Sequence, residues 1–188
     1  PQVLGQELPA LVADGYTSFK VFMTYENLRL NDREILDTLD VARDTGALVM
    51  VHCENEDAIR FLVDRHIAKG EVEPHFHATS RPVVAEREAT HRAISLAEII
   101  EVPLVIVHVS NRPAMEEIAR AKARGRIVAG ETCPQYLVLT AADLDGRNWE
   151  GAKFVCSPPP RDSDSQAACW EGLRDGTFTL FSSDHCPF

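Results

Sequence analysis

Short apolar segments alternate with amphipathic, helix-like segments from one end of the chain to the other. The apolar segments are rich in β-branched and aromatic residues, which is typical of strands. They cover residues 16–23, 47–52, 103–110, 126–131 and 178–185. Helices are expected between them, at about 32–45, 55–69, 83–101, 113–124 and 163–175. This alternation predicts an α/β protein whose parallel strands are joined by right-handed crossovers.

Local signals predict where the helices and loops begin. Asn31 or the aspartate after it can cap the first predicted helix, and Gly46 ends that helix. The segment 47–52 is a continuous apolar run, which predicts a strand buried on both faces. Residues 71–82 and 133–162 contain irregularly spaced prolines and are expected to be loops.

Two architectures fit this pattern, an open doubly wound sheet and part of a (β/α)8 barrel of the TIM type. No Gly-rich phosphate loop follows any strand, since both G-x-G-x-x-G and G-x-x-x-x-G-K-[ST] are absent. Their absence weakens a nucleotide-binding function. Polar residues gather where the strands end, and the functional residues of (β/α)8 barrels lie at these ends. The sequence therefore favours part of a barrel.

The charge balance excludes several classes of partner. The chain has 188 residues, with 19 Lys and Arg against 29 Asp and Glu, and a formal net charge of −10. A net acidic chain without a basic run is a poor candidate for binding nucleic acid or an anionic membrane. No apolar stretch approaches the roughly 20 residues that a spanning helix needs.

The cysteines and the first residues indicate a compartment and a context. Five cysteines are an odd number, and none forms a C-x-x-C pair, so neither a disulfide framework nor a zinc-thiolate knuckle is expected. Reduced thiols in a cytoplasmic protein are the expectation. The chain opens with PQVLGQELPA, which has no initiator Met and no signal-peptide pattern. We therefore expect part of a longer protein.

The residues at the ends of the predicted strands are types that bind metals. His52 and His108 each end an apolar run, and Asp184 lies at the end of the last one. Neutral imidazole suits zinc, and a carboxylate suits a hard or borderline cation. Parallel strands bring their last residues to one face, so these side chains are expected to converge. The alternative is a pair of core histidines bonded to the backbone.

Lys20 lies near the end of the first predicted strand, beside apolar residues. Burial of a charged lysine is costly, and burial or a nearby cation lowers its pKa. The neutral amine can then react with carbon dioxide to give a carbamate, whose two oxygens can bridge two metals. The alternative is an exposed or salt-bridged lysine. Glu131, at another strand end, is expected to be a plain charge of the barrel interior.

Seven short segments carry a family resemblance and are spread in order over essentially the whole chain. They resemble the hydantoinase/dihydropyrimidinase branch of the amidohydrolase superfamily. Two of them, GETCPQY and SDHCPF, are together highly specific. The resemblance implies a cyclic amidohydrolase whose (β/α)8 barrel contributes about strands four to eight here. The segments are FKVFMTY (19–25), VHCEN (51–55), SRP (80–82), VHVS (107–110), GETCPQY (130–136), CSPP (156–159) and SDHCPF (183–188).

The activity implied by the resemblance is metal-dependent hydrolysis of a cyclic amide C–N bond. A hydantoin or 5,6-dihydropyrimidine ring would be opened to the N-carbamoyl amino acid. Two divalent metal ions, expected to be zinc, would be bridged by carboxylated Lys20. His52 and His108 would bind the second metal, and Asp184 would bind the first.

The resemblance also implies how the substrate is held. Asp184 would move the proton, and Tyr25 would donate a hydrogen bond to the developing oxyanion. Ser157 would meet the substrate ring through its backbone. Phe22 would lie beside the exocyclic substituent of the ring.

One metal-binding motif of this family has no counterpart at the expected place. The family has an H-x-H pair after its first strand, whereas the only H-x-H here is His75-Phe76-His77, in a loop. A metal role is not expected for that pair. Residues 1–188 would then form a partial catalytic barrel without the first strands and the flanking β-sandwich. This piece alone is expected to be inactive, and its parent to be a homotetramer or homodimer.

Other functions fit the same sequence pattern. An allantoinase or dihydroorotase would differ only in substrate. A non-enzymatic dihydropyrimidinase-like scaffold would share the fold but lack metal ligands. The presence of Lys20, His52, His108 and Asp184 argues for an enzyme.

Overall fold

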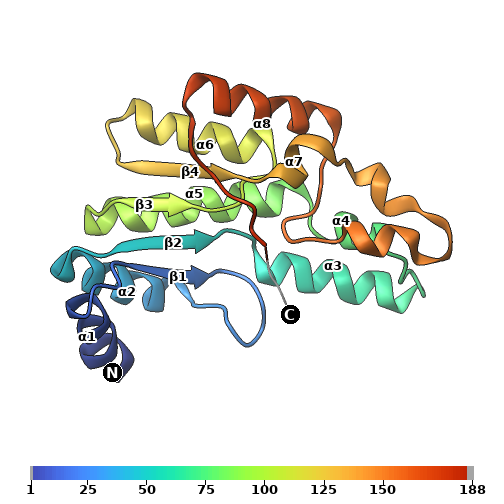
Figure 1. Ribbon diagram of the computed structural model, residues 1–188. Helices are drawn as coiled ribbons and strands as arrows, with labels where there is room; N and C mark the ends of the chain where they lie inside the picture. The colour runs from blue at the N-terminus through green and yellow to red at the C-terminus, as the bar shows by residue number, and fades with distance from the viewer. Residues whose placement is uncertain (1, 186–188) are drawn as a thin grey trace.

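Five parallel strands form one sheet in the computed structural model, which describes residues 2–185 (Figure 1). In the sheet each strand pairs with the next one in the chain, in the order β1-β2-β3-β4-β5. A doubly wound sheet reverses its strand order at a switch point, whereas a barrel segment does not. The order therefore supports part of a barrel. The strands are β1 (Ser18–Phe22), β2 (Leu48–His52), β3 (Leu104–Ile106), β4 (Val128–Thr132) and β5 (Phe178–Phe181).

Helices fill the connections between the strands. The five predicted helices are present as α2 (Asp32–Thr45), α3 (Glu56–Ala68), α5 (Val83–Ile100), α6 (Arg112–Ala123) and α8 (Ser163–Asp175). Six short elements were not predicted, and four of them make the expectation of plain loops over 71–82 and 133–162 wrong. They span five to eight residues each, too few to leave a clear helical period in the sequence. These are η1 (Val3–Glu7), α1 (Leu8–Ala13), α4 (His75–Thr79), α7 (Pro134–Val138), η2 (Ala141–Asp145) and η3 (Arg147–Phe154).

Asparagine caps fix where several helices begin. The Asn31 side chain accepts a hydrogen bond from the Glu34 N–H at 3.0 Å, and the Glu34 carboxylate accepts one from the Asn31 N–H at 2.8 Å. This capping box confirms the predicted start of α2. The Asn55 and Asn111 side chains cap α3 and α6 without such a box, by accepting from the N–H groups of Ala58 and Ala114 at 3.0 and 2.9 Å. Both caps follow the ends of β2 and β3 closely, so these helix starts lie beside the strand ends.

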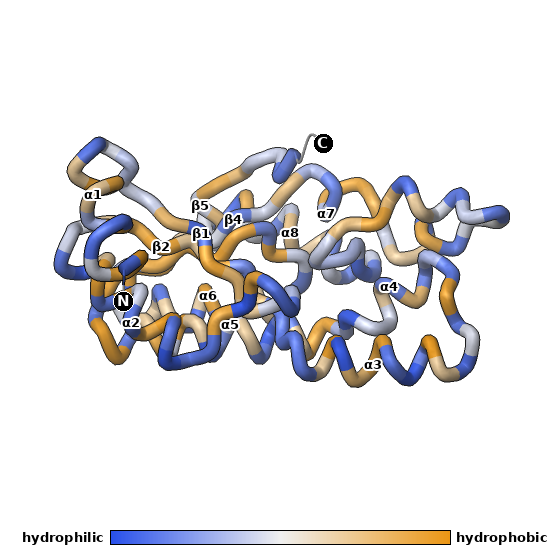
Figure 2. Tube along the Cα trace, turned by 90° about the horizontal axis from the view of Figure 1, so that it is seen from below, coloured by the Kyte–Doolittle hydropathy of each residue, from blue (hydrophilic) through white to orange (hydrophobic). Residues whose placement is uncertain are grey.

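The helices cover one face of the sheet (Figure 2). Along that face α2, α5, α6 and α8 pack side by side, and residues such as Leu39 and Ile106 are fully buried there. On the opposite face Leu48 is 36% exposed and Met50 is half-buried. The prediction that 47–52 is buried on both faces is therefore wrong at Leu48 and Met50, whereas His52, on the same face at the strand end, is only 2% exposed.

Beyond the carboxyl ends of the strands, α3, α4 and the neighbouring short helices extend the molecule to one side (Figure 1). Contacts between α3 and α4, and between α4 and η2, hold this extension together. None of the described helices combines the length and the apolar composition needed to cross a membrane.

Candidate functional site

Two buried histidines lie at the centre of the strand ends. His52 is the last residue of β2, and His108 follows β3 by two residues. Their ring centroids are 4.4 Å apart, and each residue is only 2% exposed. His108 adopts a positive φ of 41°, and its N–H donates a 3.1 Å hydrogen bond to the Glu131 carboxylate. The structure therefore brings together the two histidines that the sequence proposed as metal ligands.

Burial keeps both imidazoles neutral. It lowers the pKa of His52 to about 3, and the charges of Lys20 and Arg81 act in the same direction. It lowers the pKa of His108 well below its ordinary value, and charge on His52 adds to the effect. Neither ring nitrogen of His108 has a hydrogen-bond partner among the described residues. Unsatisfied buried nitrogens are costly, and neutral imidazole is the metal-binding form, so this pair fits a metal site.

Lys20 and Asp184 face each other beside the histidines. The Lys20 Nζ lies 4.0 Å from the Asp184 carboxylate, and both side chains are 35% exposed. The expectation of a lysine buried among apolar residues does not hold, because this face of the sheet is open. Burial raises the pKa of Asp184, the charge of Lys20 opposes this effect, and Glu131 adds to it. Within residues 2–185 no three His, Cys, Asp or Glu side chains are grouped so that they could hold a metal ion.

Aromatic rings border the histidine pair. The Tyr25 ring lies edge-on to the His52 ring at 5.1 Å between centroids, and the Phe22 ring lies 5.8 Å from it. Burial raises the pKa of Tyr25, while a hydrogen bond with Ser157 acts in the opposite direction. The three residues proposed to meet substrate, Phe22, Tyr25 and Ser157, are therefore near neighbours.

The H-x-H pair in the loop after α3 has other partners than a metal. His75 lies 3.4 Å from the Asp145 carboxylate at the surface. The His77 Nε2 lies 2.8 Å from the Cys156 carbonyl oxygen and 3.2 Å from the Ser157 hydroxyl. The two rings therefore contact different segments of the chain.

Two further residues of the site were not singled out from the sequence. Glu54 is fully buried, and its carboxylate lies 2.9 Å from the His52 Nε2. Its place two residues after His52 in a strand-end segment was an available signal. Arg81 lies in a loop far along the sequence, and its positive charge acts to lower the pKa values of His52, Glu54 and Tyr25. Arg81 lies in the SRP segment (80–82) of the family resemblance, but that segment alone does not indicate that the arginine acts on the histidine pair.

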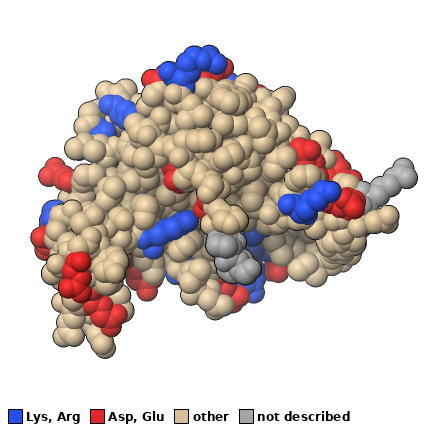
Figure 3. Space-filling model, viewed as in Figure 1, with Lys and Arg blue, Asp and Glu red and all other residues tan. Residues whose placement is uncertain are grey.

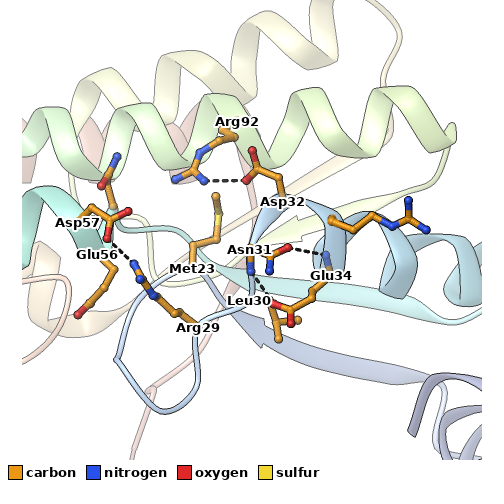
Figure 4. A pocket seen from close by; sticks show the side chains of 11 residues that line it. Met23, Arg29, Leu30, Asn31, Asp32, Glu34, Glu56, Asp57 and Arg92 are labelled. Atoms are coloured by element: carbon orange, nitrogen blue, oxygen red, sulfur yellow. Dashed lines mark hydrogen bonds and ion pairs between the residues drawn. The ribbon is translucent and has the colours of Figure 1, made fainter. Parts of the chain in front are cut away.

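A cavity of about 620 Å³ lies apart from the histidine pair, between the starts of α2 and α3 and the side of α5 (Figure 4). Two of its arginines are paired with acidic side chains of the same cavity. Arg92 lies 2.8 Å from Asp32, and Arg29 lies 2.6 Å from Asp57. Paired charges leave little to recognise a ligand, so we assign no function to this cavity.

The sequence is similar to D-hydantoinases over nearly its whole length. It is 49% identical over 184 residues to the D-hydantoinase of Rhizobium radiobacter. The aligned region is 97% of this chain and 40% of that protein. It is 47% identical over 184 residues to the D-hydantoinase of Streptomyces coelicolor, and the aligned region is 97% of this chain and 39% of that protein. The chain thus spans about 40% of the length of the curated relatives that it matches. No family model matches the chain.

Solved structures have the same fold. The dihydropyrimidinase of Brevibacillus agri aligns with a TM-score of 0.96 at 46% identity, over 100% of this chain and 41% of that one. A dihydroorotase from Campylobacter jejuni aligns with a TM-score of 0.69 at 16% identity, over 97% and 47%. That low identity shows a shared fold alone. The comparisons confirm the resemblance to the hydantoinase/dihydropyrimidinase family and the α/β class with its partial barrel.

Proposed function

We propose, from the relationship of this chain to the hydantoinases, that it belongs to an enzyme that hydrolyses a cyclic amide. Residues 1–188 would form about strands four to eight of the catalytic barrel, without the first strands and the flanking β-sandwich. The substrate would be a hydantoin or 5,6-dihydropyrimidine ring, opened to the N-carbamoyl amino acid. The observation that carries this proposal is the pair of buried, neutral histidines, 4.4 Å apart, beside Lys20 and Asp184.

The residues of the site suit two divalent metal ions, which we propose to be zinc. Carboxylated Lys20, His52 and His108 would hold one ion, and the carbamate with Asp184 would hold the other. The unsatisfied nitrogens of His108 support this assignment. When bound, such ions acidify a water molecule and polarise the amide carbonyl. Further ligands of the ion held by Asp184 would come from outside the described residues.

Each remaining residue has a role that its position supports. Asp184 would take a proton from the attacking water and pass it to the leaving nitrogen, as a positioned carboxylate can. The Tyr25 hydroxyl would donate a hydrogen bond to the carbonyl oxygen as negative charge develops there. The Ser157 backbone would hold the ring, and Phe22 would lie beside its exocyclic substituent. The closeness of the aromatic rings to His52 supports these roles.

The proposed partner is a small cyclic amide, and neither nucleic acid nor a membrane is proposed as a partner. The net charge of −10 supports that choice. Four free cysteines among the described residues support a reducing compartment, which we propose to be the cytoplasm. A homotetramer or homodimer follows from the family resemblance alone.

The test uses the full-length protein that contains this chain. It is assayed on dihydrouracil, hydantoin, dihydroorotate and allantoin, and its metal content is measured by elemental analysis. We expect hydrolysis of the first two rings and bound divalent metal. Preference for dihydroorotate or allantoin would favour those activities instead, and a metal-free protein inactive on all four would favour a scaffold.

The bridging role of Lys20 is tested by Lys20→Ala in the same protein. Because the carbamate would contribute to both ions, this change is expected to abolish metal binding and hydrolysis together. Lys153→Ala is the control, since Lys153 is an exposed lysine outside the proposed site, 2.6 Å from Glu150 and over the Phe154 ring. A Lys20→Ala protein that stayed metallated and active would refute the assignment.

A further inference from the structure

The segment that contains Ser157 is tied at both ends to the chain between α3 and α5. At one end the His77 Nε2 lies 2.8 Å from the Cys156 carbonyl oxygen and 3.2 Å from the Ser157 hydroxyl. At the other end the Arg161 guanidinium donates a hydrogen bond to the Arg81 carbonyl oxygen. Residues 157–161 therefore cannot shift without breaking contacts to residues 77–81.

The partners of His77 determine which of its nitrogens carries the proton. The Arg81 Nη1 lies 3.2 Å from the His77 Nδ1. A guanidinium can only donate, so Nδ1 must accept. A carbonyl oxygen can only accept, so Nε2 must carry the proton that faces Cys156. Burial, with the charge of Arg81, lowers the pKa of His77 to about 4, which keeps this neutral tautomer over the physiological pH range.

The Arg161 end is anchored in a buried ion pair. The Arg161 Nη2 lies 2.9 Å from the Glu86 carboxylate on α5, and both side chains are at most 5% exposed. The Arg161 Nε donates to the Ser110 hydroxyl at 2.9 Å, and the Ser110 N–H donates to Glu86 at 2.9 Å. Ser110 follows the candidate metal ligand His108 by two residues. The same network therefore connects the Ser157 segment with the loop of His108.

We propose that His77, fixed as its Nε2–H tautomer by Arg81, is a positioning residue that presents the Ser157 backbone to the substrate ring. This inference rests on the proposed function, because it takes Ser157 as the contact to the ring. His77 itself touches no reacting atom in this scheme. Its hydrogen bond to the Cys156 carbonyl oxygen sets the position of the peptide group that joins Cys156 to Ser157.

The kinetic test compares three substitutions at His77 in the full-length holoenzyme, with hydantoin and dihydrouracil as substrates. His77→Gln keeps one donor and one acceptor at similar reach, His77→Asn has an amide one methylene too short, and His77→Phe keeps ring size without a donor. A hydrogen bond contributes about 0.5–1.5 kcal/mol, which corresponds to a change of roughly 2- to 12-fold.

We expect the Phe and Asn proteins to show a KM raised by roughly that factor, with nearly unchanged kcat and metal content. A contact made equally in the ground state and the transition state changes KM alone. The Gln protein should recover most of the wild-type KM. The matched control is His75→Phe in the same loop, because His75 has no described hydrogen bond to residues 156–157; its KM should equal that of the wild type.

Hydrogen–deuterium exchange of peptides covering 155–161 gives a readout that does not need activity. Exchange should rise in His77→Phe and His77→Asn but not in His77→Gln or His75→Phe. Wild-type KM in the Phe and Asn proteins, equal defects in Gln and Phe, or a loss of metal with the fall in activity would each overturn the positioning role. A wild-type protein inactive on both rings, with the exchange pattern intact, would refute the proposed function and support the link between His77 and Ser157.

Discussion

Three residues around the histidine pair have backbone conformations that residues other than glycine rarely adopt. Tyr25, His108 and Asp184 have positive φ values of 72°, 41° and 46°. Such conformations cost on the order of 1–3 kcal/mol each and persist where the surrounding structure fixes them. All three residues have proposed roles in binding metal or stabilising charge. Positive φ values also occur elsewhere in the chain, at Glu101, Asn148 and Trp149, so this conformation does not by itself identify the site.

Tyr25 offers a test of charge stabilisation at the residue scale. In the full-length enzyme, Tyr25→Phe is expected to keep the metals and to lower kcat by roughly 10²–10³-fold, because the hydroxyl would act on charge that develops only in the transition state. Elemental analysis and steady-state rates on dihydrouracil measure both quantities. Tyr16→Phe is the control, since Tyr16 is 65% exposed. Metal loss, or an unchanged kcat, would rule out this role for Tyr25.

Residues at strand ends could be predicted from the sequence, whereas residues that act through distant contacts could not. His52 and His108 each end an apolar run, so their shared position followed from the parallel arrangement of strands. The contact between His77 and Cys156 joins residues 79 positions apart, and no spacing rule predicts it. The exposure of Lys20 was also unpredictable, because it depends on which elements cover the open face.

At the scale of elements, α8 packs so closely on its neighbours that a glycine is required within it. A Cβ added to Gly172 would lie 2.6 Å from the Phe178 ring of β5 and 2.7 Å from the Met115 sulfur of α6. Alanine favours a helix by about 1 kcal/mol over glycine, but overpacking a core costs about 1–3 kcal/mol. Gly172→Ala is therefore expected to lower the free energy of unfolding by up to about 2 kcal/mol.

Gly5→Ala is the matched control for this prediction. Gly5 is exposed within the first helical turns, and an added Cβ would meet nothing within 4 Å. The intrinsic helix preference then acts alone and raises stability by up to about 1 kcal/mol. Chemical denaturation of both variants against the wild type measures the difference. The packing argument fails if Gly172→Ala proves as stable as Gly5→Ala.

Long, capped helices were predictable at this scale, and short ones were not. The capping residue Asn31 and the ending Gly46 are local signals, and α2 begins and ends at them. By contrast, α4 and α7 have five residues each, so their existence depends on packing against other segments. The one-sided burial of β2 was missed because a continuous apolar run does not reveal whether both faces are covered.

For the whole molecule, the open face of the sheet is the face that carries the candidate site. Figure 3 shows most charged side chains at the margins of this face and few at its centre. Leu180 and Phe181 on β5 are 43% and 55% exposed. Adjacent side chains of a strand point to opposite faces, so in a closed barrel one of these two would point inward and be covered by the opposite strands. The alignment with about 40% of each relative is consistent with a barrel whose other strands lie outside this stretch.

The ligand count of the 188-residue chain predicts how much metal it holds. One ion would draw three ligands from this chain, namely the Lys20 carbamate, His52 and His108, whereas the other would draw only the carbamate and Asp184. Three protein ligands with one open position are the usual catalytic zinc arrangement, while two hold a divalent ion weakly. Because a carbamate is stabilised by its metal, the two should be gained and lost together.

We therefore expect at most one tightly held zinc per chain after dialysis, and unmodified Lys20 once a chelator removes it. Elemental analysis and intact-mass measurement, which detects the mass of one added CO2, test this directly. As a control, His108→Ala should bind no zinc tightly. The ligand assignment would be contradicted by two tightly bound ions per wild-type chain, or by a carbamate that survives metal removal.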